Sequence, residues 1–289
     1  MQILEIKNLT KYYGNILGVE SLSLSLEEGE VFGFIGPNGA GKSTTIRSIM
    51  NLVNKNEGTI LIEGQEFKKD DRKMKEKIGY LPSEIHLYDD FTVKEMLDYH
   101  ESFYQKEIHN RRRKLVKRLK LDETKKIEDL SLGNLKKVGI VLALMHDPKL
   151  LILDEPTSGL DPLMQETFFD ILKEEKQKGT TILYSTHILS EVSKICDRVG
   201  MIKEGHLLKV ETIKELHQKN FNFVTIESSE IEKIITKLKE EVIMREGNFV
   251  KIKNTLPPDQ LIKLLGNYKL EKLLIEEATL EDLFFRDYK

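Results

Sequence analysis

A glycine-rich stretch near the N-terminus limits what this chain can fold into more than any other feature. It reads Gly36-Pro37-Asn38-Gly39-Ala40-Gly41-Lys42-Ser43-Thr44. The stretch fits the phosphate-loop pattern G-x-x-x-x-G-K-[ST], which requires a strand before it and a helix after it. Residues 31–35 are a continuous apolar run of the buried-strand type, and residues 44–52 carry apolar side chains at helical spacing. We therefore expect an α/β unit with an anion site at the end of a strand.

The residue types in this stretch suit a phosphate group. Glycines allow successive backbone N–H groups to point inward and form a concavity that binds anions. The following helix directs its positive end to the same place. Lys42 adds a positive charge for the outer phosphates, and the hydroxyl of Ser43 suits a magnesium ion. A chance match in a chain of this length is expected about once in a hundred, so a functional site is favoured.

The composition sets broad limits. The chain has 289 residues, enough for one large domain or two smaller ones. The net charge of -3 gives no indication of a nucleic-acid partner. The single cysteine, Cys196, excludes an internal disulfide and is expected in a helix core. With no run of about 18 to 20 apolar residues and no secretion signal at the N-terminus, any membrane role should require a partner.

Polar side chains follow two further apolar strands. Residues 149–153 lead to Asp154 and Glu155, and residues 180–184 lead towards His187. The carboxyl end of a parallel strand is where α/β sheets bind ligands, and adjacent acids there are costly unless they are used. A lone histidine is more often structural than catalytic, but this position favours a function.

An aromatic side chain precedes the phosphate loop. An exposed ring at such a place can stack on adenine. For Tyr13, local sequence supports this interpretation and simple packing in a turn equally.

Taken in order, the motifs make the chain resemble the nucleotide-binding subunit of an ATP-binding cassette (ABC) transporter. They are the aromatic Tyr13, Walker A at residues 36–44, the lid motif Tyr80-Leu81-Pro82, the signature loop at 130–134, Walker B at 150–155, the D-loop at 158–161 and the switch residue His187. The set covers residues 1 to about 215. Each motif alone is modest, but the set in this order is highly specific. The implied fold is a P-loop NTPase cassette with a RecA-like core, an antiparallel β subdomain and a helical subdomain at about residues 84–148.

The resemblance also implies a mechanism in which two copies face each other and enclose two ATP molecules. Tyr13 would stack on adenine, residues 36–44 would hold the phosphates, and Ser43 and Asp154 would serve Mg²⁺. Glu155 would polarise the attacking water and His187 would contact the γ-phosphate. From the second copy, Ser131 and the backbone N–H of Gly133 would complete the site, with Asp161 in the D-loop.

The implied function is that of an ATPase that powers a separate membrane-spanning permease, at the cytoplasmic face of the membrane. The resemblance points to the exporters of drugs, antibiotics and peptides. Two other interpretations stay open. One is a soluble ABC protein of translation or repair, although such proteins usually carry two cassettes or a long coiled coil. The other is an ATP-dependent clamp that does not hydrolyse ATP.

Two positions depart from the family pattern. Ser83 stands where the family usually has a glutamine that reaches magnesium and the attacking water. Serine is too short to do so directly, although a water could bridge the gap, and Glu84 is a second candidate. The signature loop reads Leu-Ser-Leu-Gly-Asn, so that Leu132 replaces a glycine and restricts the backbone. We expect slower or more partner-dependent hydrolysis, not its loss.

Residues 219–289 are expected to form a separate small α/β unit. The pattern predicts strands at 222–226, 249–252 and 272–275, and helices at 230–241, 258–265 and 280–285. This β-α-β-α-β order suggests a ferredoxin-like layer. The ending at residues 278–284 resembles the tail of exporter ATPases of the ABC family, with dimer contact or regulation as a hypothesis for its role.

Overall fold

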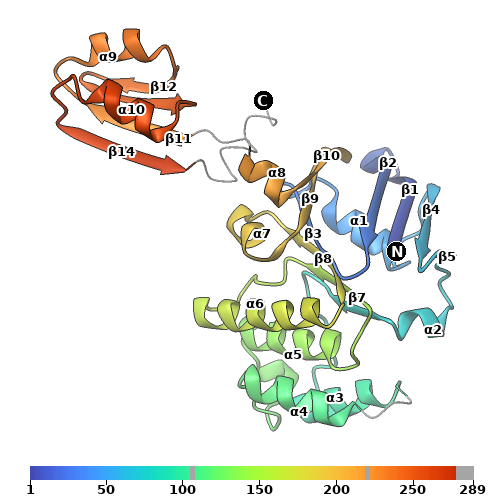
Figure 1. Cartoon of the computed structure of the whole chain (residues 1–289). Coiled ribbons are helices and arrows are strands. Elements are labelled where there is room, and N and C mark those ends of the chain that lie inside the picture. The colour runs from blue at the N-terminus through green and yellow to red at the C-terminus, as the bar shows by residue number, and fades with distance from the viewer. Residues whose placement is uncertain (105–107, 219–221, 278–289) are drawn as a thin grey trace. The chain divides into compact units, whose positions relative to one another are not determined.

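The structure, a computed structural model, describes residues 1–104, 108–218 and 222–277 (Figure 1). The chain divides into two compact units, Met1–Ile213 and Lys214–Lys289. Each unit is described by itself below. That they are separate functional domains, as predicted for residues 1–215 and 219–289, stays a prediction.

The first unit contains a six-stranded sheet with the order β10-β9-β3-β8-β7-β6. These strands are His206–Thr212, Arg198–Lys203, Val31–Ile35, Thr181–Thr186, Leu150–Asp154 and Ile78–Leu81, respectively. All neighbouring pairs are parallel except β9 and β10. The carboxyl ends of β3, β8, β7 and β6 therefore lie side by side at one edge, where α/β sheets bind ligands.

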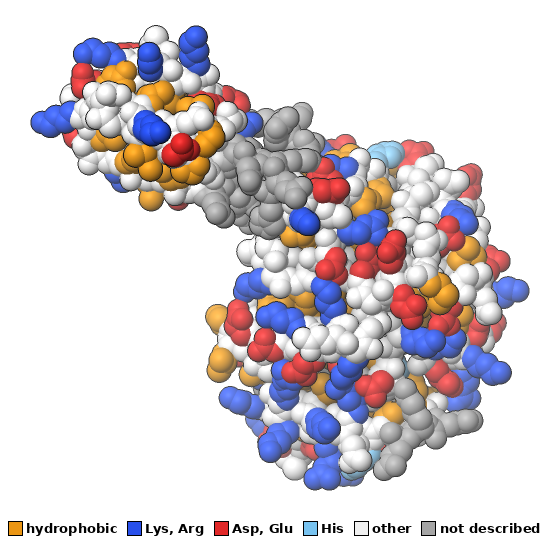
Figure 2. Space-filling view, in the orientation of Figure 1, with side chains coloured by type: hydrophobic (Ala, Val, Ile, Leu, Met, Phe, Trp, Pro, Cys, Tyr) orange, Lys and Arg blue, Asp and Glu red, His pale blue; other side chains and the backbone are white. Residues whose placement is uncertain are grey.

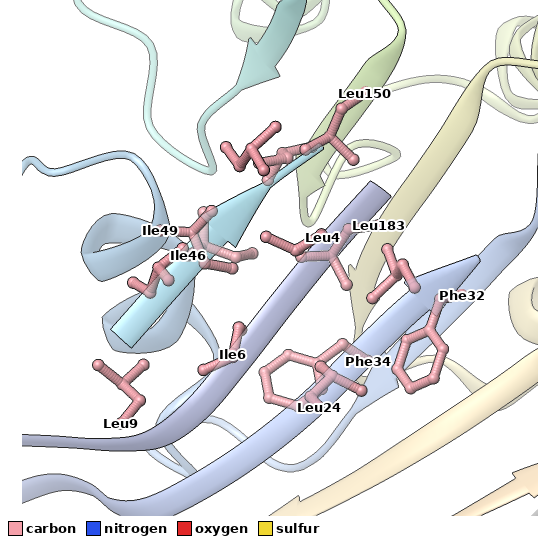
Figure 3. Packing of buried hydrophobic residues seen from close by; sticks show 14 of the residues in the cluster. Leu4, Ile6, Leu9, Leu24, Phe32, Phe34, Ile46, Ile49, Leu150 and Leu183 are labelled. Atoms are coloured by element: carbon pink, nitrogen blue, oxygen red, sulfur yellow. The ribbon is translucent and has the colours of Figure 1, made fainter. Parts of the chain in front are cut away.

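A second, antiparallel sheet has the order β2-β1-β4-β5. Its strands are Ile16–Glu27, Gln2–Tyr13, Glu57–Ile62 and Gln65–Glu66. One apolar cluster joins this sheet to the first sheet and to helix α1 (Lys42–Ile49). Figure 3 shows this packing, with labelled residues from β1 (Leu4, Ile6, Leu9), β2 (Leu24), β3 (Phe32, Phe34), α1 (Ile46, Ile49), β7 (Leu150) and β8 (Leu183). The cluster anchors the helix that begins at the phosphate loop.

Three helices occupy the stretch between β6 and β7, in the region predicted to be the helical subdomain. They are α3 (Val93–Glu101), α4 (His109–Arg118) and α5 (Leu132–Leu144), with a short 3-10 helix at Ile127–Asp129. Thr92 and Glu95 form a capping box at the start of α3. The buried Arg112 of α4 joins α3 through hydrogen bonds to Asp98 and Glu101. Helices α6 (Pro162–Gln177) and α7 (Leu189–Ile195) follow β7 and β8.

Capping residues set where helices of this unit begin. The charged stretch 68–77 forms only the short helix α2 (Arg72–Lys75), which Asp71 caps. The helix after the phosphate loop begins earlier than predicted, at Lys42, because the left-handed Gly41 is its cap. Helix α5 begins at Leu132, because Ser131 caps it.

The second unit is a small sheet covered by two helices. Helix α8 (Ile213–Gln218) leads into it, and its order is β11 (Asn222–Glu227), α9 (Ile231–Leu238), β12 (Glu241–Glu246), β13 (Phe249–Asn254), α10 (Pro258–Leu265) and β14 (Lys272–Glu277). The antiparallel sheet has the order β12-β13-β11-β14. A β-α-β-β-α-β order is that of the ferredoxin-like motif. Val224, Ile226, Val250 and Ile252 form a core with the helices.

The sequence pattern missed strand β12. The predicted helix 230–241 ends at Leu238 because Lys239 takes a left-handed conformation, with φ 55°. The following strand lies at the edge of the sheet, and all its side chains are exposed. It therefore lacks the alternation that signals a half-buried strand. The predicted helix 280–285 and the tail 278–284 lie outside the described residues.

Two features bear on partners. Over the described part of the chain, no helix is both long and apolar enough to cross a membrane. On the face of the first unit drawn in Figure 2, Lys and Arg side chains are interspersed with Asp and Glu side chains.

Candidate functional site

The phosphate loop joins β3 to α1 in a shape that needs glycine at two positions. Gly41 has a φ of 109°, and a Cβ there would lie 2.6 Å from the carbonyl oxygen of Gly18. A Cβ on Gly36 would lie 2.3 Å from the carbonyl oxygen of Ile202. Both neighbours are backbone atoms, so larger residues would displace the loop. The loop is therefore held close to β2 and β9.

Lys42 is buried at the first position of α1, with 5% of its surface exposed. Its Nζ donates hydrogen bonds to the carbonyl oxygens of Gly36 (2.7 Å) and Pro37 (3.1 Å). The same Nζ lies 3.4 Å from Oε1 of Glu155. The charge of Lys42 therefore lies in the loop itself, where it can exchange these acceptors for phosphate oxygens.

The two acids at the end of β7 have different surroundings. Asp154 is buried, and Ser185 of β8 donates a 3.1 Å hydrogen bond to its Oδ1. Glu155 has a φ of 47°, a left-handed conformation that is strained for a residue other than glycine. Nδ1 of His187 lies 2.9 Å from its Oε2. Oε1 is buried and makes no hydrogen bond within the described residues, so it remains available as an acceptor.

A cavity of about 390 Å³ lies over this loop. Its lining residues are Tyr13, Ile16, Leu17, Gly18, Asn38, Gly39, Gly41, Lys42, Ser43, Thr44, Ser83 and Glu155. Such a volume is typical of a small-molecule site. The ring of Tyr13 is 42% exposed, and Lys11 Nζ lies 4.9 Å from its centroid. Tyr13 thus presents an accessible aromatic face at the cavity.

The signature and D-loop residues lie together, but they do not line this cavity. Ser131 caps α5 by accepting a hydrogen bond from the N–H of Asn134 (3.4 Å). A Cβ on Gly133 would lie 2.6 Å from the carbonyl oxygen of Gly159, so the two loops are in close contact. Asp161 caps α6 through the N–H of Met164 (2.9 Å). Within one chain, the structure does not bring Ser131, Gly133 or Asp161 to the phosphate loop.

The position of the missing glutamine is occupied by Ser83, which lines the cavity. Glu84, the second candidate, has a side chain that is 81% exposed and lies 3.8 Å from Nε2 of His86. It does not line the cavity. The structure therefore does not support Glu84 as a replacement for the glutamine.

The donor set fits a nucleotide with magnesium. Mg²⁺ usually binds to one or two protein ligands together with phosphate oxygens and waters. The described residues contain no group of three or more His, Cys, Asp or Glu side chains that could hold a metal. The Ser43 hydroxyl, the Asp154 carboxylate and the substrate would hold the ion.

Sequence patterns missed two buried charged residues beside the site. Glu191 of α7 accepts hydrogen bonds from the hydroxyls of Thr157 (2.5 Å), Tyr184 (3.0 Å) and Thr186 (2.7 Å). Glu191 follows His187 by four residues, and this short spacing is the sequence feature that could have indicated a charged side chain near the switch histidine. Lys136 of α5 is also buried, and desolvation lowers its pKa, although Asp154 and Glu155 oppose this effect. No sequence feature around Lys136 could have indicated that it is buried.

Comparisons with known proteins identify relatives of this chain. A family model described as "ABC transporter" matches residues 19–158. The linearmycin resistance ATP-binding protein LnrL of Bacillus subtilis is 39% identical, over 74% of this chain and 70% of that protein. The bacitracin transport ATP-binding protein BcrA of Bacillus licheniformis is 33% identical, over 98% and 96%. A solved dimeric ATP-binding cassette with bound ADP and Pi has a TM-score of 0.65 and 26% identity, over 73% and 98%.

Proposed function

This chain belongs to the ABC transporter family as an ATP-binding subunit, and from that premise we propose how its residues hydrolyse ATP. Membership confirms the predicted P-loop cassette fold and the predicted ATPase that drives transport, with ATP and Mg²⁺ as its ligands. It also confirms the predicted partners, a second cassette and a membrane permease. The roles of individual residues are the proposal.

The observation that carries the proposal is the meeting of Lys42 and Glu155. Their side chains lie 3.4 Å apart at the cavity, although Lys42 begins α1 and Glu155 directly follows β7. We assign Lys42 and the loop N–H groups to the outer phosphates. Glu155 Oε1 accepts the proton of the attacking water, and His187 holds Oε2 and contacts the γ-phosphate. Magnesium, when bound at Ser43 and Asp154, supplies positive charge that stabilises the phosphate oxygens.

The proposal also places Ser131 and Gly133 of one copy against the ATP of the other. Their absence from the cavity of their own chain supports this arrangement. The N-terminus of α5, where both lie, suits an anion. A second copy that presents this helix end to the cavity would complete the site.

Mixing two cysteine variants tests the arrangement. We expect Asn38→Cys chains and Ser131→Cys chains to form a disulfide-linked dimer when they are mixed with ATP and an oxidant, because Asn38 lines the cavity. Cys196 is buried, so the background should be low. The measurement is the dimer band on a non-reducing gel, and each variant alone is the control. No mixed dimer, or one that forms equally well without ATP, would contradict the proposal.

Tyr13 is proposed to stack on adenine. Tyr13→Ala should weaken ATP affinity about 5- to 150-fold, because base stacking is worth roughly 1 to 3 kcal/mol. Tyr13→Trp keeps an aromatic face and should bind ATP like the wild type. Tyr12→Phe is the neighbouring control, since the Tyr12 hydroxyl contacts Glu20 and the residue does not line the cavity. Equilibrium binding of ATP measures all three, and unchanged affinity in Tyr13→Ala would exclude stacking.

We further propose that the subunit works at the cytoplasmic face of the membrane and drives export of a drug or a peptide antibiotic. The names of the relatives support this proposal, since one concerns linearmycin resistance and the other bacitracin transport. The clamp that only binds ATP is less favoured, because Glu155 is present and faces the cavity.

A further inference from the structure

Lys136 is a buried charge that the proposed reaction does not use. Only 2% of its surface is exposed, on a helix that also buries Val138, Ile140 and Val141. Burying an ammonium group is costly unless it is well paired. Its Nζ donates to the carbonyl oxygens of Ser83 (2.9 Å), Pro82 (3.4 Å) and Glu155 (3.4 Å). One side chain thus joins α5 to the lid loop and to the residue proposed as the base.

The backbone of Glu155 needs such support. A left-handed residue other than glycine persists only where its surroundings hold it in place, and Glu155 has a φ of 47°. Its carbonyl oxygen receives the N–H of Ser158 at 3.3 Å besides Nζ of Lys136. Because the carboxylate must stay within hydrogen-bond reach of the attacking water, the orientation of this peptide matters for the reaction.

The same face of α5 is packed tightly against the lid. A Cβ on Gly139, one turn after Lys136, would lie 2.5 Å from the end of the Ile85 side chain and 2.7 Å from the end of the Leu81 side chain. One turn further, the carbonyl oxygen of Ala143 would lie 2.1 Å from a Cβ on Gly79 of β6. The helix that begins at Ser131 is therefore in direct contact with β6 and with the lid that follows it.

We propose that Lys136 is a positioning residue. It holds the Glu155 peptide and the lid carbonyl groups of Pro82 and Ser83 in a fixed position relative to helix α5, which begins in the signature loop. Through it, contact at Ser131 is transmitted to the base of the same chain. Lys136 touches neither substrate nor metal in this arrangement. The side chain of Ser83 is too short to reach magnesium and the attacking water directly, as a glutamine would. In this chain the lid instead contacts the site through its backbone carbonyl groups, which accept hydrogen bonds from Lys136.

This inference rests on the proposed role of Glu155. The alternative is a lysine that only stabilises the fold. The two roles predict different effects when Lys136 is replaced. A purely stabilising role would change the melting temperature and leave turnover by the folded protein intact. A positioning role lowers kcat while ATP binding stays the same.

The test compares Lys136→Met with Lys137→Met in the full chain. Lys137 is the next residue on the same helix and is partly exposed, so its variant controls for lost charge. We expect Lys136→Met to lower kcat on the order of tenfold to a hundredfold, as for a slightly misplaced catalytic group. KM for ATP and the ATP dissociation constant should stay unchanged. Lys136→Arg, which keeps charged donors, should recover part of the lost turnover.

Glu155→Gln is measured beside these variants. If it keeps wild-type turnover, the proposed function fails. If it loses turnover while Lys136→Met does not, only this inference fails. Turnover by Lys136→Arg no higher than that of Lys136→Met would also overturn it. If Lys136→Met does not fold, Lys136→Gln, with a shorter side chain, replaces it with the same two outcomes.

Discussion

Replacing Glu155 by glutamine is expected to lower ATP turnover by about 10² to 10⁴, the usual contribution of a general base. This corresponds to roughly 3 to 5 kcal/mol of transition-state stabilisation. Glutamine keeps the shape of the side chain and can still approach His187, but its neutral amide cannot accept the proton of water. Single-turnover hydrolysis of ATP by the full chain with its permease is the measurement.

ATP binding should survive this change, so a binding measurement separates the binding step from the chemical step. The glycines and Lys42 of the loop remain, and the 3.4 Å ion pair between Lys42 and Glu155 is removed. The Nζ of Lys42 then loses a competitor for phosphate, so affinity should be equal to that of the wild type or tighter. A slow enzyme with intact binding would identify Glu155 as a group needed for the chemical step.

A matched control for Glu155→Gln is Glu204→Gln. Glu204 is an exposed acid in a turn, with a φ of 48°, so both positions place glutamic acid in the same backbone region. Glu204 does not line the cavity. Its variant should hydrolyse ATP like the wild type. Equal rates for Glu155→Gln and wild type would refute the assignment of Glu155 as the base. They would then favour the interpretation as a clamp that binds ATP without hydrolysing it.

The parts of the site that sequence could predict are those set by short-range pattern. The phosphate loop was readable because its glycines and Lys42 follow a fixed spacing. Asp154 and Glu155 were readable because they end an apolar strand. Their meeting with Lys42 depended on the parallel order β3-β8-β7, which residue pattern alone does not fix.

Other features could not be predicted because they depend on which way a side chain faces. Lys136 and Lys137 are adjacent in the sequence, yet one is buried against carbonyl groups and the other is partly exposed. Glu191 has the sequence surroundings of an ordinary helix acid, yet three hydroxyls donate hydrogen bonds to it. Strand β12 could not be predicted for a similar reason. An exposed edge strand has no buried face, so its sequence lacks the alternation of apolar and polar residues.

The second large effect is expected at Gly41. Gly41→Ala should weaken ATP binding about 10- to 150-fold, because a lost hydrogen bond to a charged group costs roughly 1.5 to 3 kcal/mol. An alanine there would have to keep a φ of 109° and place its Cβ 2.6 Å from the carbonyl oxygen of Gly18. The loop must shift, and Lys42, the next residue, shifts with it. Equilibrium binding of ATP measures the loss.

Gly64→Ala separates the effect of backbone conformation from that of crowding. Gly64 also has a left-handed φ, of 75°, but a Cβ there would meet nothing within 4 Å. Its variant should cost about 1 to 3 kcal/mol of strain at most and leave ATP binding unchanged. If Gly41→Ala bound ATP as well as Gly64→Ala does, the close approach of β2 would not be what holds the phosphate loop. The phosphate loop would then have to bind ATP with Gly41 displaced from the carbonyl oxygen of Gly18.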